Sequence, residues 1–296
     1  MRKLSSLFVC TLIVTAAFAL ASCNSESDNT PIKENYLPEV IAKDFSTRYG
    51  DNTIEHVYTG TDFYRHTGQQ ETNVYSKNKT GDELFVSYVD NVWNRAVQSL
   101  SDINNLPYNV RKSFSKVIPD TARYEFWERE EVTQACISGK YYVLCYLVYD
   151  SSVPSLHTLV IDSEGTVLKV CGYELNNTAY VRPLPTDIDW ISEHYKGSVV
   201  LGYVNDMGDD DYLIMHNGVL KSVLFDSDNL DAKWKETRYA LPESATVTDR
   251  VLDALHAAHP DFTYTEISVV ESPNGNYYLF VDGTRPDRLG YYIEVN

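Results

Sequence analysis

Residues 139–149 read Gly-Lys-Tyr-Tyr-Val-Leu-Cys-Tyr-Leu-Val-Tyr. Side chains in a β-strand alternate between its two faces, and here both alternating sets are apolar, one beginning at Tyr141 and the other at Tyr142. A strand that is apolar on both faces belongs inside a sheet whose two faces are both covered. We therefore expect a helix on one face, and another part of the chain or a partner on the other.

This stretch belongs to a pattern that recurs along the chain. Residues 275–280 (Gly-Asn-Tyr-Tyr-Leu-Phe) nearly copy residues 139–144. Leu-Pro pairs occur four times, and apolar residues spaced by three or four positions follow each pair. This spacing is typical of one face of a short helix, with proline tolerated near its start. The pairs and their stripes are Leu37-Pro38 with Ile41, Phe45 and Tyr49; Leu106-Pro107 with Val110, Phe114 and Ile118; Leu184-Pro185 with Ile188, Ile191 and Tyr195; and Leu241-Pro242 with Val251, Leu255 and His259.

Strand-like segments follow each predicted helix. Asn217-Gly218, between two apolar runs, is the strongest short hairpin signal in the chain. Residues 89–100 have an apolar spacing that would also suit a helix, but their alignment with the later units predicts strands. The first strands of the four units are predicted at 53–58, 121–127, 198–203 and 262–268.

The repeat predicts an α+β fold, in which each unit is one helix followed by three or four antiparallel strands. One helix on three strands cannot hide its apolar face, so neighbouring units should pair into larger sheets. We expect two modules, each with its helices on one sheet face. The modules are 37–180, made of units 37–105 and 106–180, and 181–296, made of units 181–240 and 241–296.

The first residues have the pattern of a secretion signal. Arg2 and Lys3 precede the apolar run 4–20, which is short for a membrane-spanning helix. The run ends at Leu20-Ala21-Ser22-Cys23, which resembles a bacterial lipobox and implies removal of residues 1–22 and acylation of Cys23. Several acyl chains make a stable membrane anchor. A plain signal peptide with an incidental cysteine is the alternative.

The anchor would be followed by a polar tether over residues 23–36. Its early acids, Glu26 and Asp28, resemble the acidic stretches that send some Gram-negative lipoproteins to the cell surface. We expect a protein anchored in the outer membrane that faces the periplasm or the cell exterior.

Composition and missing motifs exclude several function classes. The chain has 296 residues with 25 Lys plus Arg against 42 Asp plus Glu, a net charge of −17 that argues against nucleic acid as a partner. The sequence contains no Gly-x-Ser-x-Gly elbow, no phosphate loop and no His-Glu-x-x-His helix. We expect no catalytic residues, no cofactor and no enzyme activity. His256 and His259 have a spacing that could share a metal, but His259 occupies a packing position of the helix stripe, so no metal site is predicted.

Two acidic clusters allow two interpretations. Crowded oxygen ligands suit Ca²⁺, whereas aspartates are also common in hairpin turns. The clusters are Asp206, Asp209, Asp210 and Asp211, and then Asp226, Asp228 and Asp231. The cysteines Cys136, Cys145 and Cys171 lie in apolar runs and are expected in the core, and their disulfide pairing stays open.

Tyrosine is in excess, with 23 Tyr against 10 Phe. Tyrosine is enriched at interfaces because it joins a rigid apolar ring to a polar tip, although aromatic residues also favour sheets. If one sheet face is open, Tyr142, Tyr146 and Trp127 are the candidate binding residues.

The Leu-Pro-led helix, the Gly-x-Tyr-Tyr strand and the Asp-Gly-like turn together resemble the PepSY-like and β-lactamase-inhibitor-protein-like (BLIP-like) lipoproteins of Gram-negative bacteria. The resemblance covers roughly residues 37–296. It implies tandem helix-plus-sheet units with one open, concave sheet face, which in the inhibitor grips an enzyme. Inhibition of β-lactamase is not expected here, because this chain has four units, no obvious disulfide in each pair and no loop that matches the inhibitory one.

The expected function is therefore that of a lipid-anchored extracytoplasmic protein that binds a protein partner, as an inhibitor or adaptor, through an open Tyr-rich sheet face. A surface protein that binds glycans on exposed Tyr and Trp rings is one alternative. A structural spacer of the cell envelope is another.

Overall fold

The computed structural model describes residues 33–34, 36–61, 68–118, 123–149, 154–172, 182–206, 208–228, 230–242, 245–283 and 290–295. From Lys33 onward the chain forms one compact unit. The predicted signal peptide and Cys23 lie outside the described residues. Within the described ranges, no helix is both long and apolar enough to span a membrane.

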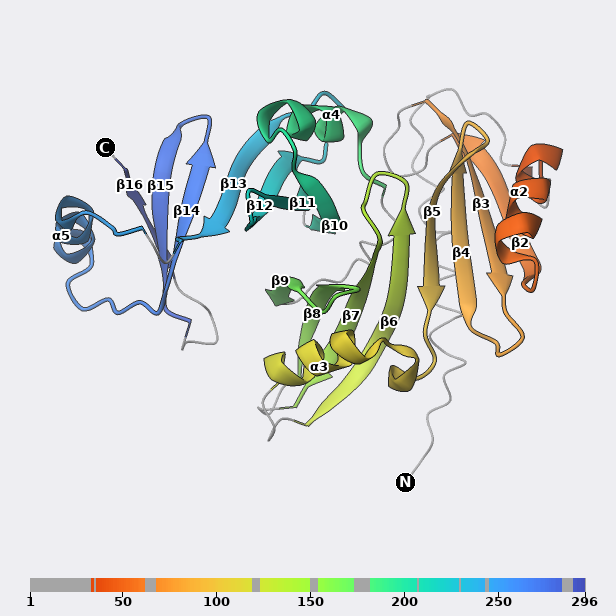
Figure 1. The fold of residues 1–296 in the computed structure, drawn as a ribbon, viewed down its shortest axis with the longest axis horizontal. Helices are drawn as coiled ribbons and strands as arrows, with labels where there is room; N and C mark the ends of the chain where they lie inside the picture. Colours follow the sequence, from red (N-terminus) through yellow and green to blue (C-terminus); the bar gives the residue numbers. More distant parts are fainter. Residues whose placement is uncertain are drawn as a thin grey trace, which may run out of the picture. The chain divides into compact units, whose positions relative to one another are not determined.

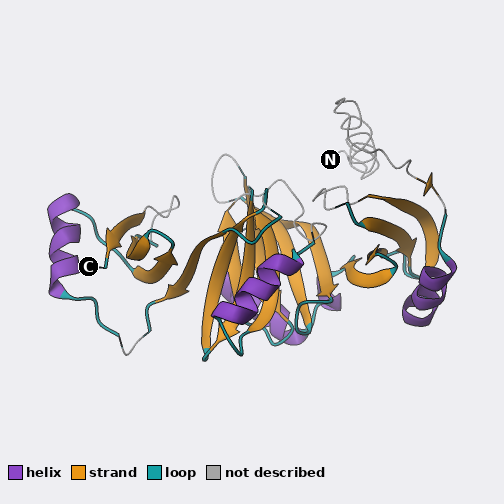
Figure 2. Cartoon of the chain, turned by 90° about the horizontal axis from the view of Figure 1, so that it is seen from above, coloured by secondary structure: helices purple, strands orange, loops and turns teal. Residues whose placement is uncertain are grey.

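The described part of the chain is α+β, with two antiparallel sheets whose strands follow one another in sequence order and with α-helices packed on the sheets (Figures 1 and 2). The first sheet contains β1 (Lys33–Glu34), β2 (Thr53–Thr61), β3 (Gln70–Lys77), β4 (Glu83–Val89), β5 (Val92–Ser99), β6 (Tyr124–Gln134), β7 (Lys140–Val148), β8 (Ser155–Asp162) and β9 (Val167–Gly172). The second sheet contains β10 (Val199–Asp206), β11 (Asp209–His216), β12 (Val219–Asp226), β13 (Trp234–Ala240), β14 (Glu266–Ser272), β15 (Gly275–Val281) and β16 (Gly290–Glu294).

The four predicted helices are present. They are α2 (Glu39–Tyr49), α3 (Tyr108–Val117), α4 (Pro185–His194) and α5 (Asp249–Ala258), and a short 3₁₀ turn, η2 (Ile103–Asn105), precedes α3. The first three begin at or directly after their Leu-Pro pair, since proline suits a helix start. α5 begins at Asp249, seven residues after Pro242.

The hairpin signals also form as predicted. Asn217 and Gly218 have φ angles of 52° and 77°, which is the left-handed geometry of a tight two-residue hairpin, and they join β11 to β12. Asp90 and Asn91, with φ angles of 49° and 66°, do the same between β4 and β5. This turn is why residues 92–99 form a strand rather than a helix.

Two predicted strands begin several residues later than expected. β6 starts at Tyr124 rather than at residue 121, and residues 121–122 lie outside the described residues. Residues 262–265 form a loop, and β14 starts only at Glu266. The ring of Phe262 lies 4.8 Å from that of Tyr291, and the Phe262 N–H donates to the carbonyl of His259. Packing against α5 and β16 therefore keeps residues 262–265 from joining the sheet as part of β14. His259 itself stacks on Tyr291 as a packing residue.

The helices α2 and α3 cover one face of the first sheet. Ile41 and Phe45 of α2 pack in a cluster with Val86 of β4, whereas Val110 and Phe114 of α3 pack in a cluster that includes residues of β7 and β8. Leu84 belongs to the α2 cluster and Tyr142 belongs to the α3 cluster. The residue pairing across β5 and β6 places Leu84 and Tyr142 on the same face of the sheet, so both helices lie on the same side.

The opposite face of β7 meets the second sheet. Tyr141, Val143 and Cys145 are buried in one cluster with Tyr203 and Leu213. β10 lies against β7 and β8, and the N–H of Ser138 donates to the carbonyl of Val200 at 2.9 Å. The prediction that β7 is covered on both faces is confirmed. The division into modules at residues 180 and 181 stays a prediction.

Candidate binding face

The predicted binding residues separate into two groups. Tyr142 and Tyr146 lie beneath α3, each only 3% exposed, and the ring of Tyr146 meets Phe114 edge-on at 5.3 Å. Their predicted position on an open face is wrong, because the alternation of β7 turns these two rings toward the helix. Trp127 is 58% exposed and lies where the β6–β7 register shifts. Whether any of the three contacts a partner remains a prediction.

The helix-free face of the first sheet carries a different set of aromatic rings, over β2, β3 and β4. His56 is exposed, Tyr58 is half-buried and Tyr75 is 37% exposed, whereas Phe85 is buried. Strand pairing places His56 beside Tyr75, and Tyr75 beside Phe85, on this face. Exposed aromatic rings that adjoin one another are typical of interaction surfaces.

These four residues form a continuous series of ring contacts, which we call the aromatic ladder. Ring centroids are 6.4 Å apart for His56 and Tyr58, 5.7 Å for Tyr58 and Tyr75, and 5.1 Å for Tyr75 and Phe85. Tyr58 and Tyr75 meet edge-on, which is a favoured geometry for aromatic pairs. The ladder runs from the edge strand inward, and its outer rings offer a rigid apolar surface with polar tips.

The inner end of the ladder adjoins a buried polar cluster. The Arg95 guanidinium lies 5.3 Å from the centre of the Phe85 ring and forms an ion pair with Glu71 at 3.6 Å. Both side chains are almost fully buried, and Ser87 donates a hydrogen bond of 2.5 Å to the same Glu71 carboxylate. A buried charge without a counter-charge is strongly destabilising, so Arg95 and Glu71 depend on each other.

Two amide side chains complete this cluster. Asn73 pairs in register with Ser87, and Gln134 pairs in register with Arg95. Both are at most 5% exposed, and in the part of the chain that the structure describes the Asn73 Oδ1 atom and both amide atoms of Gln134 have no hydrogen-bond partner. Such atoms can hydrogen-bond to water or to polar groups of a ligand.

The outer end of the ladder adjoins a partly unpaired strand edge. β1 pairs with β2 only at Tyr58 and Thr59. Across the described ranges, no strand pairs with the outer edge of β2 from Thr53 to Val57. The N–H and C=O groups of an edge strand can pair with an extended segment of another chain. Glu55 lies at an irregularity in the register of this edge and pairs with Lys77 at 3.1 Å.

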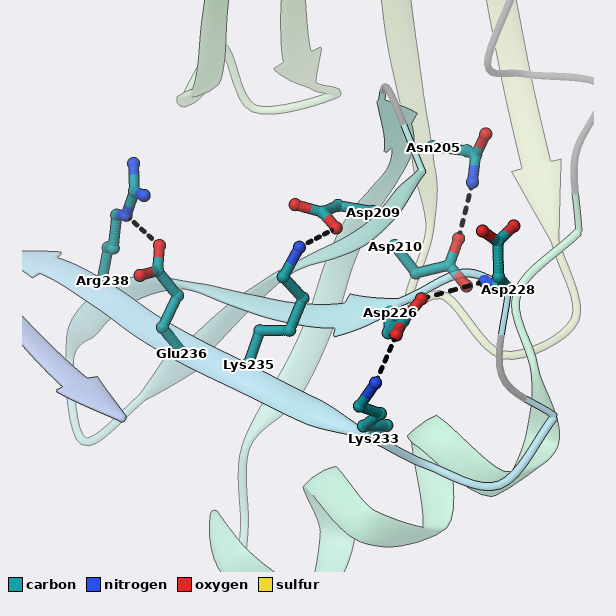
Figure 3. Close-up of polar contacts among 9 residues, drawn as sticks. All are labelled: Asn205, Asp209, Asp210, Asp226, Asp228, Lys233, Lys235, Glu236 and Arg238. Carbon is teal, nitrogen blue, oxygen red and sulfur yellow. Dashed lines mark hydrogen bonds and ion pairs between the residues drawn. The ribbon is translucent and has the colours of Figure 1, made fainter. Parts of the chain in front are cut away.

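The second sheet places members of both predicted acidic clusters beside lysines, whereas the side chain of Asp206 lies outside the described residues. Figure 3 shows Lys233 directed at Asp226 and Lys235 directed at Asp209. Asp210 is buried and accepts hydrogen bonds from the Asn205 amide (2.8 Å) and from the Tyr203 hydroxyl. Asp211 pairs with Lys169 at 3.0 Å. In the described residues no group of three His, Cys, Asp or Glu side chains is placed to hold a metal ion.

Two of the predicted core cysteines are described with their side chains. Cys145 is buried, and Cys136 packs partly buried against the same cluster. Burial raises the pKa of the Cys136 thiol to about 11, so it stays protonated near neutral pH. The core interpretation is confirmed for these two, whereas the side chain of Cys171 lies outside the described residues.

Three of the four tryptophans pack in the interior. Trp190 and Trp234 stack on each other with centroids 5.2 Å apart, and Trp93 donates a hydrogen bond to the hydroxyl of Tyr49 on α2. Trp127 is the exposed one. Of the four tryptophans, Trp127 is therefore the one that offers an exposed ring for the glycan-binding alternative.

The chain is similar to several solved structures from Bacteroides. A BLIP-like protein from Bacteroides fragilis is 16% identical with a TM-score of 0.39, and the likeness covers 51% of this chain and 97% of that one. A DUF2874 family protein from Bacteroides ovatus is 14% identical with a TM-score of 0.37, covering 50% and 99%. A candidate periplasmic protein from Bacteroides eggerthii is 12% identical with a TM-score of 0.36, covering 50% and 100%.

A BLIP-like protein is thus among the structures that this chain resembles. No protein-family model and no curated protein matches the chain.

Proposed function

We propose that this chain is a lipid-anchored extracytoplasmic protein that binds a protein partner on the aromatic ladder of β2–β4. The observation that carries the proposal is the ladder itself. Its outer rings lie on a sheet face that neither α2 nor α3 covers, and beside them runs an edge of β2 with which no strand of the described residues pairs from Thr53 to Val57. Aromatic anchors beside a strand edge suit an extended polypeptide, whose backbone adds to the sheet while its side chains contact the rings.

The location follows from the first 23 residues. The apolar run and the lipobox-like end at Cys23 support export and acylation. We assign the protein to the outer membrane, facing the periplasm or the cell exterior, and we assign it no catalytic step.

We also propose the finer organisation of the fold, with four units paired into the modules 37–180 and 181–296. The element order supports it, because a helix followed by four strands occurs three times and a helix followed by three strands completes the chain. Each module would contribute one sheet.

Site-specific photo-crosslinking tests the binding face. A photoreactive phenylalanine analogue replaces Tyr75 in the full chain in cells, and Tyr36, which is 53% exposed in the segment before α2, serves as the control position. We expect a discrete adduct with one envelope protein at position 75 and none at position 36. Tyr58→Ala should abolish the adduct at position 75, because it removes the adjoining ring of the ladder.

Adducts of equal yield at both positions, or none at position 75, would contradict the assignment of this face. Acylation is tested separately with Cys23→Ser, which should release the protein from the membrane fraction. Retention of this variant in the membrane after a 500 mM salt wash, which releases a charge-based contact, would contradict the lipid anchor without affecting the binding face.

Trp127 favours a second candidate function, glycan binding. A ring that is 58% exposed can stack on a sugar face. A glycan array read with the wild-type chain and with Trp127→Ala decides this candidate: glycans that bind only the wild type would support it, and an array without hits would exclude it.

A further inference from the structure

The exposed side of α3 is unlike any other helix surface of the described chain. Its sequence, Tyr-Asn-Val-Arg-Lys-Ser-Phe-Ser-Lys-Val, carries three cations and no acid. α2 has two cations and two acids, α4 has three acids, and α5 has two acids and one arginine. In a chain with a net charge of −17, three cations within six residues are a strong local reversal of charge.

The three cations lie on one stripe of the helix, away from the core. Val110 and Phe114 point into the sheet, whereas the residues of the stripe line a shallow hollow of about 400 Å³ on the outer surface. The residues of this stripe are Tyr108, Arg111, Lys112, Ser115 and Lys116. Tyr108 is 68% exposed at the first turn, so the stripe combines positive charge with one amphipathic ring.

The cations of the stripe differ from most other described lysines in their ion pairing. In the part of the chain that the structure describes, none of the three pairs with a carboxylate. Arg111 donates to the Asn104 amide oxygen at 3.2 Å, which leaves its charge intact. Most other described lysines pair with acids: Lys77, Lys79, Lys140, Lys169, Lys221, Lys233 and Lys235.

We propose that the α3 stripe docks on an anionic membrane surface and so sets the orientation of the anchored protein. Lysine and arginine near an anionic leaflet are attracted to lipid phosphates, and tyrosine suits the headgroup level. The choice of a membrane as occupant rests on the lipid anchor of the proposed function. The charge reversal itself is independent of that anchor.

The length of the tether permits this contact. Lys33, where the described chain begins, is ten residue steps from Cys23, and ten steps can span about 35 Å when extended. Six strand spacings separate β1 from β7, which lies beneath α3, and together they measure about 29 Å. An acyl anchor and the α3 stripe can therefore reach the same surface.

Vesicle binding tests the proposal on a chain that begins at Asn24 and lacks Cys23, so acylation plays no part. Residues 33–296 are one compact unit with all four hydrophobic clusters, so this chain retains the whole folded part. Sedimentation is measured with vesicles of phosphatidylcholine alone and with 30% phosphatidylglycerol, at 50 mM and 500 mM salt. We expect binding only to the anionic vesicles, and release at high salt.

A neutralised variant and a charge-matched control complete the design. Arg111→Gln, Lys112→Gln and Lys116→Gln together should weaken binding about 100-fold, because each charge contributes about fivefold near an anionic surface. The control removes three exposed lysines from other turns and loops, and should change binding less than about fivefold. It combines Lys79→Gln and Lys196→Gln in turns with Lys233→Gln in the loop before β13, so none of the three lies within a strand. Thermal melts confirm that both variants fold.

Three outcomes would overturn the proposal: no binding of the wild type to anionic vesicles, equal losses in the two triple variants, or α3-dependent capture of polyglutamate without vesicle binding. The last would assign the stripe to an acidic polypeptide. If vesicle binding is retained while Cys23→Ser stays in the membrane fraction even at 500 mM salt, only the proposed anchor fails.

Discussion

Gly202 of β10 lies close to Leu168 of the first sheet, and its replacement by alanine tests whether the two sheets pack as described. A Cβ atom at this position would lie 2.8 Å from the Leu168 Cδ1 atom of β9 and 3.4 Å from Leu213 Cδ1. Ordinary contacts between carbon atoms are about 3.5–4.0 Å. The Leu168 side chain must therefore move by about 1 Å, or β10 must lift from β9.

The magnitude follows from two opposing terms. Overpacking by one methyl group costs about 1–3 kcal/mol, whereas replacing glycine by alanine stabilises by about 0.4–1 kcal/mol through the unfolded chain. Gly202→Ala should thus lower the free energy of unfolding by about 1 kcal/mol. Leu168→Ala removes a buried side chain and should cost about 2 kcal/mol, the low end for leucine, because β9 is an edge strand.

The double variant carries the decisive measurement. The cavity left by Leu168→Ala accommodates the new methyl group, so Gly202→Ala should cost nothing in that background, and the coupling free energy should be at least about 1 kcal/mol. Urea denaturation followed by the fluorescence of Trp190 and Trp234 suits the assay, because both rings pack against the same cluster. Additivity within about 0.3 kcal/mol would refute the contact between the sheets. The face of β7 that contains Tyr141 would then be available to a partner.

Three further results are expected. Hydrogen bonds, foremost from Ser101, lower the pKa of Asp82 to about 2, so its contribution to stability is present above pH 3.8 and disappears as the pH falls toward 2. Asp82→Asn should therefore lower the free energy of unfolding by about 1 kcal/mol at pH 7, allowing for solvent screening, and denaturation at several pH values measures this loss. Lys169→Met leaves the Asp211 carboxylate, which is 3% exposed, without its cation, so it should lower the free energy of unfolding by about 3 kcal/mol in urea denaturation. A loss under 1 kcal/mol would contradict this ion pair between the sheets. Calcium should leave the thermal midpoint unchanged, because lysines already hold carboxylates of both acidic clusters, and a rise of several degrees would show otherwise.

Local signals predicted the helices and hairpins because local physics decides them. The Leu-Pro pairs precede apolar stripes at helical spacing, and Ile41 and Phe45 are buried as the stripe requires. The turn at Asn217-Gly218 needs residues that tolerate positive φ, and its sequence supplies them. By contrast, residues 262–265 were predicted as the start of a strand because a strand-like segment follows each predicted helix. Their rings pack on α5 and its neighbouring strands, a tertiary contact that no local pattern contains.

The candidate binding face was missed because alternation separates two faces without saying which one is covered. Tyr142 and Tyr146 satisfied the expectation of an apolar strand with polar tips, yet they belong to the helix side. His56 and Tyr58 alternate in the same way along an edge strand, and only the strand pairing places Tyr75 beside them on the helix-free side. The buried polar cluster around Arg95 could not be predicted either, because its members come from separate strands that only the strand pairing brings together.

The difference between the two groups of tyrosines also bears on function. Tyr142 is buried, and its hydroxyl donates to Glu131 at 3.0 Å, so its polar tip is satisfied within the protein and the residue is explained by the core. Tyr75 lies on a face that no helix of the first sheet covers, 37% of it is exposed, and its ring spans the gap between Tyr58 and buried Phe85. A large aromatic ring in such a position gains less from folding than a buried one does. Its ring contacts hold its orientation, which suits the binding face that we propose.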